Sequence, residues 1–332
     1  MVPPSYVTVL QPRTTKPSLL DDSMLPVALA VLWAAATTNA AHRVCPLGGD
    51  SCATTVAPVC PALETPERLM KAPPPRSLPC SYESYVIQDN SLYRMDLRSG
   101  HREILSANVR GNIAALVYNH LDSMLYGVNH DKIMRIYPNG ATELVTDLGV
   151  LKKGFNRGRD KFVPKMGAID KWGQYWLSVY SGGEYIVVDL NPRSRSFGTV
   201  RAQGASRLPR NIGRWRLPAG WAWTVGDMHS LYGIGYDYLT GRTALFRWKI
   251  QTSAWEVVGH AKSRADGDTF SAVVATSDGI VYGLEDSTGD IFRFNISAPN
   301  HMDLLQRAGP ISQSTPKSNT AARCVLLEDG LR

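Results

Sequence analysis

The sequence predicts an all-β protein, a single β-propeller of about five four-stranded blades closed by the C-terminal strand. Three observations predict it: a short phrase that recurs along the chain, a second phrase that precedes each copy, and a C-terminal segment that resembles the strand missing from the first repeat. The composition agrees, because 28 Gly, 21 Pro and 14 Tyr accompany short apolar bursts rather than long runs with a helical period.

The first phrase is an apolar residue, a large apolar residue, Arg and another apolar residue. Its copies are Leu92–Met95, Ile133–Ile136, Leu245–Trp248 and Ile291–Phe294, and Tyr185–Asp189 keeps the strand pattern without the Arg. The second phrase precedes it across a polar turn, at Leu125–Gly127, Tyr175–Leu177, Leu231–Gly233 and Val281–Gly283, with Tyr85–Ile87 as a weaker copy. Two such strands joined by a turn form a β-hairpin.

A third strand precedes each hairpin and a fourth follows it. The third is marked by a small residue, at Ala115, Ala168, Ala222 and Ala272, and is followed by a turn that contains Asp122, Asp170, Asp227 or Asp278. The fourth is clearest at Thr142–Val145 and Trp255–Val258. Each unit is therefore a four-stranded meander at the spacing of propeller blades, and the small Ala suits the crowded strand nearest the axis.

The first repeat lacks its Ala-marked strand, since nothing like it precedes Tyr85. The segment Ala321–Leu327, followed by Glu328–Gly330, matches Ala272–Gly279 and would complete that blade. A ring closed in this way leaves no exposed sheet edge. The expected blades are 84–105 with 320–327, 112–148, 165–202, 220–260 and 269–308. The alternative is an open β-sandwich of the same strands, although a sandwich requires neither equal units nor a split first unit.

The N-terminal region predicts export. The uncharged apolar run Met24–Ala36 and the small residues after it have the layout of a signal peptide, and the run is shorter than the ~20 residues that span a bilayer. A buried helix or signal anchor is the alternative, and the true start is either residue 1 or Met24. We therefore expect a signal region at 1–41, a Cys- and Pro-rich arm at 42–79, the propeller at 80–327 and a tail at 328–332, in a secreted protein.

The cysteines all follow the expected cleavage site, in a compartment where disulfides persist. Cys80 and Cys324 fall near each other where the predicted ring closes, so a disulfide is expected there, while the pairing of Cys45, Cys52 and Cys60 stays open. No Cys-x-x-Cys or paired His is present, so neither a metal site nor a cofactor is predicted. The sequon Asn295–Ser297 predicts glycosylation of Asn295 in an exported chain.

With Tyr93–Leu97, Tyr118–Gly127 and the closing Asn319–Cys324 in view, the chain resembles an uncharacterised family of secreted, propeller-like domains found in fungi and filamentous bacteria. The family carries a domain-of-unknown-function label. The resemblance covers about Cys80–Cys324, and it implies the fold and export but no mechanism.

Catalysis is not indicated, although the pattern leaves it open. A propeller glycosidase requires two or three carboxylates near the axis, yet the starts of the predicted inner strands contain no Asp or Glu. The repeated Asp residues occupy turn positions, where Asp bonds the backbone. A lactonase- or glycosidase-like hydrolase and an interaction scaffold therefore remain as alternatives to a binding module.

The charge distribution suggests where a ligand would bind. Between Lys152 and Arg216 there are fourteen Lys and Arg but four Asp and Glu residues, a local excess larger than the +7 of the whole chain. A basic, Trp-bearing mouth would attract an anionic or glycan-containing extracellular ligand. The predicted binding residues are Arg157, Arg159, Lys161, Arg210, Arg214, Trp215, Arg216 and Trp221.

The alternative interpretation of this region is that its charges only solubilise the loops while the tryptophans fill blade cores. An extracellular glycan or protein is the expected partner. We expect no nucleic-acid partner, no membrane association after signal cleavage, and a monomer.

Overall fold

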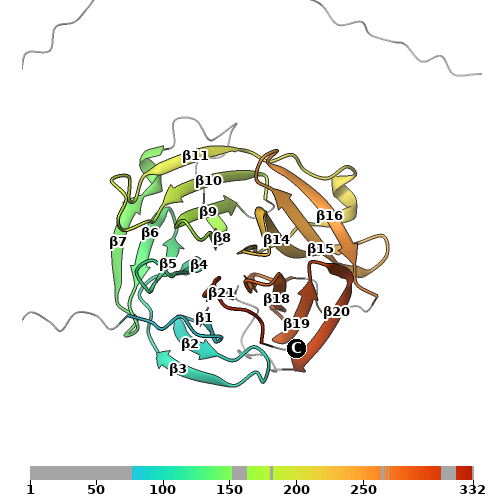
Figure 1. The fold of residues 1–332 in the computed structure, drawn as a ribbon, viewed down its shortest axis with the longest axis horizontal. Coiled ribbons are helices and arrows are strands. Elements are labelled where there is room, and N and C mark those ends of the chain that lie inside the picture. The colour runs from blue at the N-terminus through green and yellow to red at the C-terminus, as the bar shows by residue number, and fades with distance from the viewer. Residues whose placement is uncertain are drawn as a thin grey trace, which may run out of the picture. The chain divides into compact units, whose positions relative to one another are not determined.

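A computed structural model describes residues 77–151, 163–179, 182–262, 265, 267, 269–307 and 319–330. These residues form five antiparallel sheets arranged as the blades of a closed ring, which confirms the predicted five-bladed β-propeller (Figure 1). The expected signal region and Cys45, Cys52 and Cys60 lie outside the described residues. The described part of the chain has no helix with the length and hydropathy that a membrane span requires.

The strands of each sheet follow one another from the axis outward. The first sheet contains β21 (Thr320–Arg323), β1 (Ser84–Gln88), β2 (Ser91–Met95) and β3 (Arg102–Ser106). The second contains β4 (Ile113–Asn119), β5 (Met124–Asn129), β6 (Lys132–Ile136) and β7 (Thr142–Asp147). The third contains β8 (Pro164–Ile169), β9 (Gln174–Val179), β10 (Glu184–Asp189) and β11 (Val200–Ala205).

The fourth sheet has a divided inner edge, because β12 (Trp215–Arg216) and β13 (Ala222–Thr224) both pair with β14 (Asp227–Asp237). It continues through β15 (Arg242–Lys249) and β16 (Ala254–His260). The fifth contains β17 (Ala272–Ala275), β18 (Ile280–Leu284), β19 (Asp290–Asn295) and β20 (Ala298–Arg307). In the described part of the chain, the short 3-10 helices η2 (Leu148–Leu151) and η3 (Ile212–Arg214) lie in connections between sheets.

The ring closes as predicted. The C-terminal β21 pairs antiparallel with β1, with Ala321 opposite Val86, and supplies the inner strand of the first sheet. The predicted Cys80–Cys324 disulfide is present, with 5.3 Å between the two Cα atoms, and joins residues 244 positions apart in the chain. We call this junction of β21 with β1 and Cys80 the seam.

The core is divided among the interfaces between neighbouring sheets. Five clusters of buried apolar residues each join two adjacent blades, and the cluster between the first and second contains Tyr85 and Tyr118 stacked 5.7 Å apart. Inner strands approach closely, because a Cβ on Gly167 would collide with the carbonyl oxygen of Ala115. The buried Tyr175 hydroxyl donates to that same oxygen, so β4 and β8 are held together near the axis.

The repeated Arg holds the outer strands of a blade together. In the second sheet, Arg135 Nε donates to the Tyr126 hydroxyl at 3.0 Å, and that hydroxyl donates to Asp122 at 2.5 Å. Arg135 also pairs with Glu143 on the outermost strand, at 3.3 Å. One Arg thus links the second, third and fourth strands to the turn after the first, which explains why the phrases recur together.

In the fifth sheet, next to the seam, the carboxylate of the equivalent network is the side chain of Asp329, which follows β21. In the fifth sheet, Arg293 Nε and Nη2 donate to Asp329 Oδ2 at 3.0 and 2.9 Å, and the Tyr282 hydroxyl donates to Asp329 Oδ1. Asp278 instead accepts bonds from Thr276 Oγ1 and from the Asp329 backbone N–H. The chain beyond β21 therefore clamps the first sheet to the fifth.

Candidate functional site

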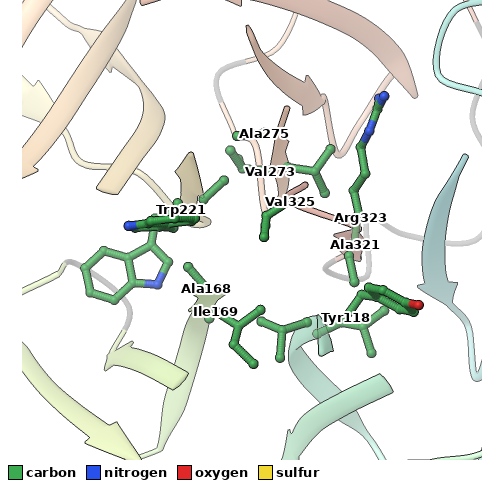
Figure 2. A pocket seen from close by; sticks show the side chains of 16 residues that line it. Tyr118, Ala168, Ile169, Trp221, Val273, Ala275, Ala321, Arg323 and Val325 are labelled. Carbon is green, nitrogen blue, oxygen red and sulfur yellow. The ribbon is translucent and has the colours of Figure 1, made fainter. Parts of the chain in front are cut away.

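The channel along the propeller axis is nearly filled. The side chains that surround it come from the inner strands and are mostly apolar, including Ile169, Trp221, Val273 and Val325 (Figure 2). Its volume of about 20 Å³ suits roughly one water molecule. Arg323 extends away from the centre and stacks over the Tyr282 ring at 5.7 Å. The middle of the channel is therefore packed core rather than a ligand pore.

A larger cavity of about 180 Å³ opens where the inner strands begin, and we call it the axial cavity. All five blades contribute to its wall. The lining residues are Ala114, Lys165, Ala219, Thr269, Ser271, Asp286, Asn319 and Thr320. Because ligand sites favour concave surfaces with a few convergent polar groups, this cavity is the candidate site.

Asp286 supplies the carboxylate of the axial cavity from the turn between β18 and β19. Its Oδ1 accepts bonds from the Ser271 N–H at 3.2 Å and the Ser271 hydroxyl at 2.6 Å. Burial raises the pKa of Asp286 to about 6; the Ser271 bonds and the charge of Arg216 oppose the rise, and the neighbouring Glu285 adds to it. The carboxylate is thus mostly ionised at neutral pH but sits where ionisation is costly.

The adjacent acid has a structural role instead. Glu285 Oε2 accepts four hydrogen bonds of 2.7 to 2.9 Å from the N–H and hydroxyl groups of Ser287 and Thr288. These bonds shape the turn that presents Asp286. No donor in the described ranges bonds Asp286 Oδ2, so the turn leaves one carboxylate oxygen available to a ligand.

Lys165 and Asn319 add a cation and an amide to the wall. A bulge between Pro164 and Met166 takes Lys165 out of the β8–β9 ladder, its side chain is exposed, and no carboxylate of the described chain pairs with it. Asn319 is only 2% exposed, yet neither its Oδ1 nor its Nδ2 has a hydrogen-bond partner among described residues. Each unpaired buried group costs about 1–3 kcal/mol, which a bound partner would recover.

Of the predicted binding residues, the basic ones are only partly available. Arg157, Arg159 and Lys161 lie outside the described residues, and Arg210 is exposed. Arg214 is already paired, because its Nε and Nη2 donate to Asp237 at 2.8 and 2.6 Å and hold the pKa of that carboxyl well below its usual range. Arg216 lies in β12, close enough to the axial cavity for its charge to lower the pKa of Asp286.

The predicted aromatic residues pack inward. Trp215 is half-buried, with Arg214 stacked on one side at 4.5 Å and Phe246 against it at 5.7 Å. Trp221 is 1% exposed and packs against Trp248 and Trp255, so it offers no face on which a ligand could stack. The prediction for Trp221 is corrected: an aromatic ring between two blades stabilises the protein more as core than as surface.

Asp286 and Asn319 are absent from the predicted binding residues. The search for carboxylates covered the starts of the inner strands, which contain no Asp or Glu, whereas Asp286 reaches the axis from the hairpin turn between the second and third strands of its blade. The sequence feature that could have indicated this site is the pair Glu285-Asp286 directly before Ser-Thr-Gly. Glu285 bonds the turn, and Asp286 is not needed for it. Among the described residues, no group of three or more His, Cys, Asp or Glu could hold a metal ion.

The fold defines the class of protein: a closed five-bladed propeller with a small cavity at one end of its axis, whose wall is mostly apolar with a few polar groups. Residues 85–325 match the family described as "Repeat of unknown function (DUF6923)", and the chain belongs to this family. No curated protein matches the chain. The predicted resemblance to an uncharacterised propeller family is thereby confirmed.

The comparison with solved structures finds matches of low similarity. A chain of a nidogen/laminin complex is 10% identical with a TM-score of 0.42, over 69% of this chain and 79% of that one. Virginiamycin B lyase from Staphylococcus aureus is 13% identical with a TM-score of 0.37, over 69% of each chain. A streptogramin B lyase is 12% identical with a TM-score of 0.37, over 73% of each chain.

Proposed function

We propose that this protein is an exported, non-enzymatic propeller that binds a small ligand in the axial cavity. The observation that carries the proposal is the convergence of an ionised carboxylate, an unpaired ammonium and an unpartnered buried amide, from Asp286, Lys165 and Asn319, on one cavity. Each of the three keeps at least one polar atom without a hydrogen-bond partner in the described chain. Costly polar groups gathered in a concavity are typical of binding sites.

The basic surface has a secondary role in this proposal. Arg214 is paired with Asp237 and Trp221 is buried in the core, so the predicted anion- or glycan-binding face lacks its central contacts. Exposed cations such as Arg210 still create a positive potential, which raises the local concentration of a ligand that carries negative charge. An anionic group on the ligand therefore remains part of the proposal, with Lys165 as its contact.

A hydrolase is the less supported alternative. A glycosidase of the usual kind needs two carboxyl groups that flank the scissile bond. Only Asp286 lines the axial cavity as a carboxylate among the described residues, and the neighbouring Glu285 is committed to its turn. An interaction scaffold is the remaining alternative, and the proposal would give way to it if no small molecule binds.

Export is supported by the seam. The Cys80–Cys324 disulfide is the kind of link that persists in an oxidising compartment, which agrees with the signal-like run predicted at Met24–Ala36. The proposed location is extracellular, and the N-terminal sequence of protein recovered from the culture medium of an expressing host tests it. A mature chain that begins within a few residues of Ala41 is expected; retention of the intact chain inside the cells would contradict export.

A fragment screen by ligand-observed NMR tests the binding proposal. The variant Ala114→Phe places a ring in the axial cavity, whereas Ala202→Phe adds the same ring on the exposed outermost strand of the third blade. We expect small polar fragments to bind wild type and Ala202→Phe but not Ala114→Phe, with all three proteins sharing the same circular dichroism. Fragments that bind Ala114→Phe as well as wild type, or no binding at all, would overturn the proposal.

The same proteins address the enzymatic alternative. Incubation with lactones and aryl glycosides, with and without a metal chelator, is expected to give no turnover above buffer. Turnover that Asp286→Asn abolishes would replace the binding proposal with a hydrolase that uses the same cavity.

A further inference from the structure

We infer that the ligand of the axial cavity is a small zwitterion, with an ammonium group bound by Asp286 and a carboxylate bound by Lys165. This inference rests on the proposed function and specifies the chemical class of its ligand. It follows from the charges of the wall, the hydrogen bonds of each group and the size of the cavity.

Asp286 is arranged to accept from a cation. The two Ser271 bonds hold Oδ1, and the Asp286 backbone N–H donates to the Thr269 carbonyl at 2.9 Å, so both the side chain and the backbone of Asp286 are fixed. A fixed carboxylate with one open oxygen needs no reorganisation to bind an ammonium donor. Charge-assisted bonds of this kind are about twice as strong as neutral ones, and more so in a site that excludes water.

Lys165 supplies the opposite charge on the wall from the third blade. The β8 bulge removes it from strand pairing, and in the described chain it forms no ion pair with Asp286 or another acid. Two opposite charges that share a cavity without neutralising each other leave both available to a ligand that carries the complementary pair. A singly charged ligand would satisfy one of them and leave the other uncompensated.

Asn319 matches either end of such a molecule. Its unpartnered Nδ2 can donate to a carboxylate, and its unpartnered Oδ1 can accept from an ammonium group. The neighbouring Thr320 hydroxyl already accepts the Leu116 N–H at 2.8 Å, so it can donate to a carboxylate but offers less than Asn319 to an ammonium group. Asn319 is thus the neutral polar contact, and the methyl groups of Ala114 and Ala219 provide an apolar wall for a short aliphatic linker.

The volume restricts the ligand to a small molecule. A cavity of about 180 Å³ equals the space of roughly six waters at about 30 Å³ each. Pockets for drug-sized ligands have volumes of about 300–1,000 Å³, so the axial cavity is smaller than these. It suits a free amino acid or a short ω-amino acid, but not several residues of a peptide or a glycan chain.

Calorimetric titration of the intact protein tests the inference with three probes that share a four-carbon chain: 4-aminobutyrate, butylamine and butyrate. We expect 4-aminobutyrate to bind about tenfold or more tightly than either singly charged probe, because only the zwitterion compensates both charges of the wall. The longer and shorter ω-amino acids, from glycine to 6-aminohexanoate, then report the spacing of the two charges.

Variants assign each end of the zwitterion. Asp286→Asn should reduce the affinity for 4-aminobutyrate to about the affinity for butyrate, because the site for the ammonium group is lost. Lys165→Met should reduce the affinity for 4-aminobutyrate to about the affinity for butylamine, because the site for the carboxylate is lost. Lys171→Met is the matched control, since Lys171 stacks on Trp172 in the turn at the opposite end of the same blade, and it should bind all probes as wild type does.

The pH dependence gives an independent readout. Affinity for 4-aminobutyrate should fall about tenfold per pH unit below about 6 as Asp286 takes up a proton, and this dependence should disappear in Asp286→Asn. Among the described residues, the other charged groups near Asp286 are Glu285, Arg216 and Lys165. The inference is wrong if neutral fragments bind the cavity as tightly as the zwitterion, or if both variants bind it like wild type; failure of every fragment would instead remove the proposed function itself.

Discussion

Removing the Cys80–Cys324 disulfide should destabilise the propeller by about 5 kcal/mol. The bond closes a loop across 244 positions, and a crosslink over so long a loop removes a large conformational entropy from the unfolded chain. The double variant Cys80→Ala/Cys324→Ala is the suitable perturbation, because it leaves no free thiol at the seam and Cys324 is buried among apolar side chains.

The native contacts explain why this bond matters at the seam. The closing strand β21 is four residues long and forms only four register pairs with β1. Every other blade is formed by one continuous stretch of chain, so its strands pair with much less chain closure. Without the disulfide, β21 must find β1 across almost the entire ring, and only a few hydrogen bonds compensate for the entropy of that closure.

Equilibrium unfolding in urea, followed by tryptophan fluorescence, measures the effect. The double variant and reduced wild type should unfold at the same midpoint, well below that of the oxidised protein, and native gels should show that all three start folded. Unfolding free energies of oxidised wild type and the double variant that agree within about 1 kcal/mol would show that strand pairing alone closes the ring, and would refute the reasoning.

Three further predictions concern single residues. Asp329→Asn should lower the free energy of unfolding by about 3 kcal/mol, because Arg293 loses the charge of its buried partner and Asp329 is only 2% exposed. Thermal denaturation measures this effect, and an unchanged melting temperature would contradict the clamp at the seam. Asp286→Asn should raise the free energy of unfolding at pH 7 by up to about 3 kcal/mol, and solvent screening of the carboxylate reduces this gain. The pKa of Asp286 is about 6 in the folded protein and lower in the unfolded chain, so ionised Asp286 destabilises wild type increasingly as the pH rises from about 4 to 6. The stability gained by Asp286→Asn should therefore vanish near pH 4. Urea unfolding at pH 7 and pH 4 measures both values. Asn295 begins the sequon Asn295–Ser297 at the end of β19. Protein secreted from a eukaryotic host should therefore lose the mass of one glycan on enzymatic deglycosylation, and Asn295→Gln should show no such change.

Sequence periodicity was sufficient for the blades because each is a local meander. The hairpins of Leu125–Gly127 with Ile133–Ile136, and of Val281–Gly283 with Ile291–Phe294, pair residues close in the chain, so their pattern and turns determine their pairing. The Arg of each phrase recurs for a local reason as well, since Arg135 contacts Tyr126 and Glu143 within its own sheet.

The candidate site was less predictable because its members meet only in three dimensions. Lys165, Asp286 and Asn319 come from three different blades, and no spacing along the chain relates them. Trp221 was predicted to lie on an aromatic surface together with Trp215, yet Trp248 and Trp255 cover its ring. Burial depends on packing between elements, which the local pattern does not specify.

The sequence by itself determined the strands, their grouping into five units and the return of the C-terminus to the first of them, because these depend on short-range alternation, turn residues and one missing strand. Only the tertiary structure decided that Asp329 completes the polar network of the fifth blade and that Asp286 is the acid left open at the axis. The physical reason is that a polar group's role depends on which partners reach it, and in a closed ring those partners come from chain segments far away in sequence.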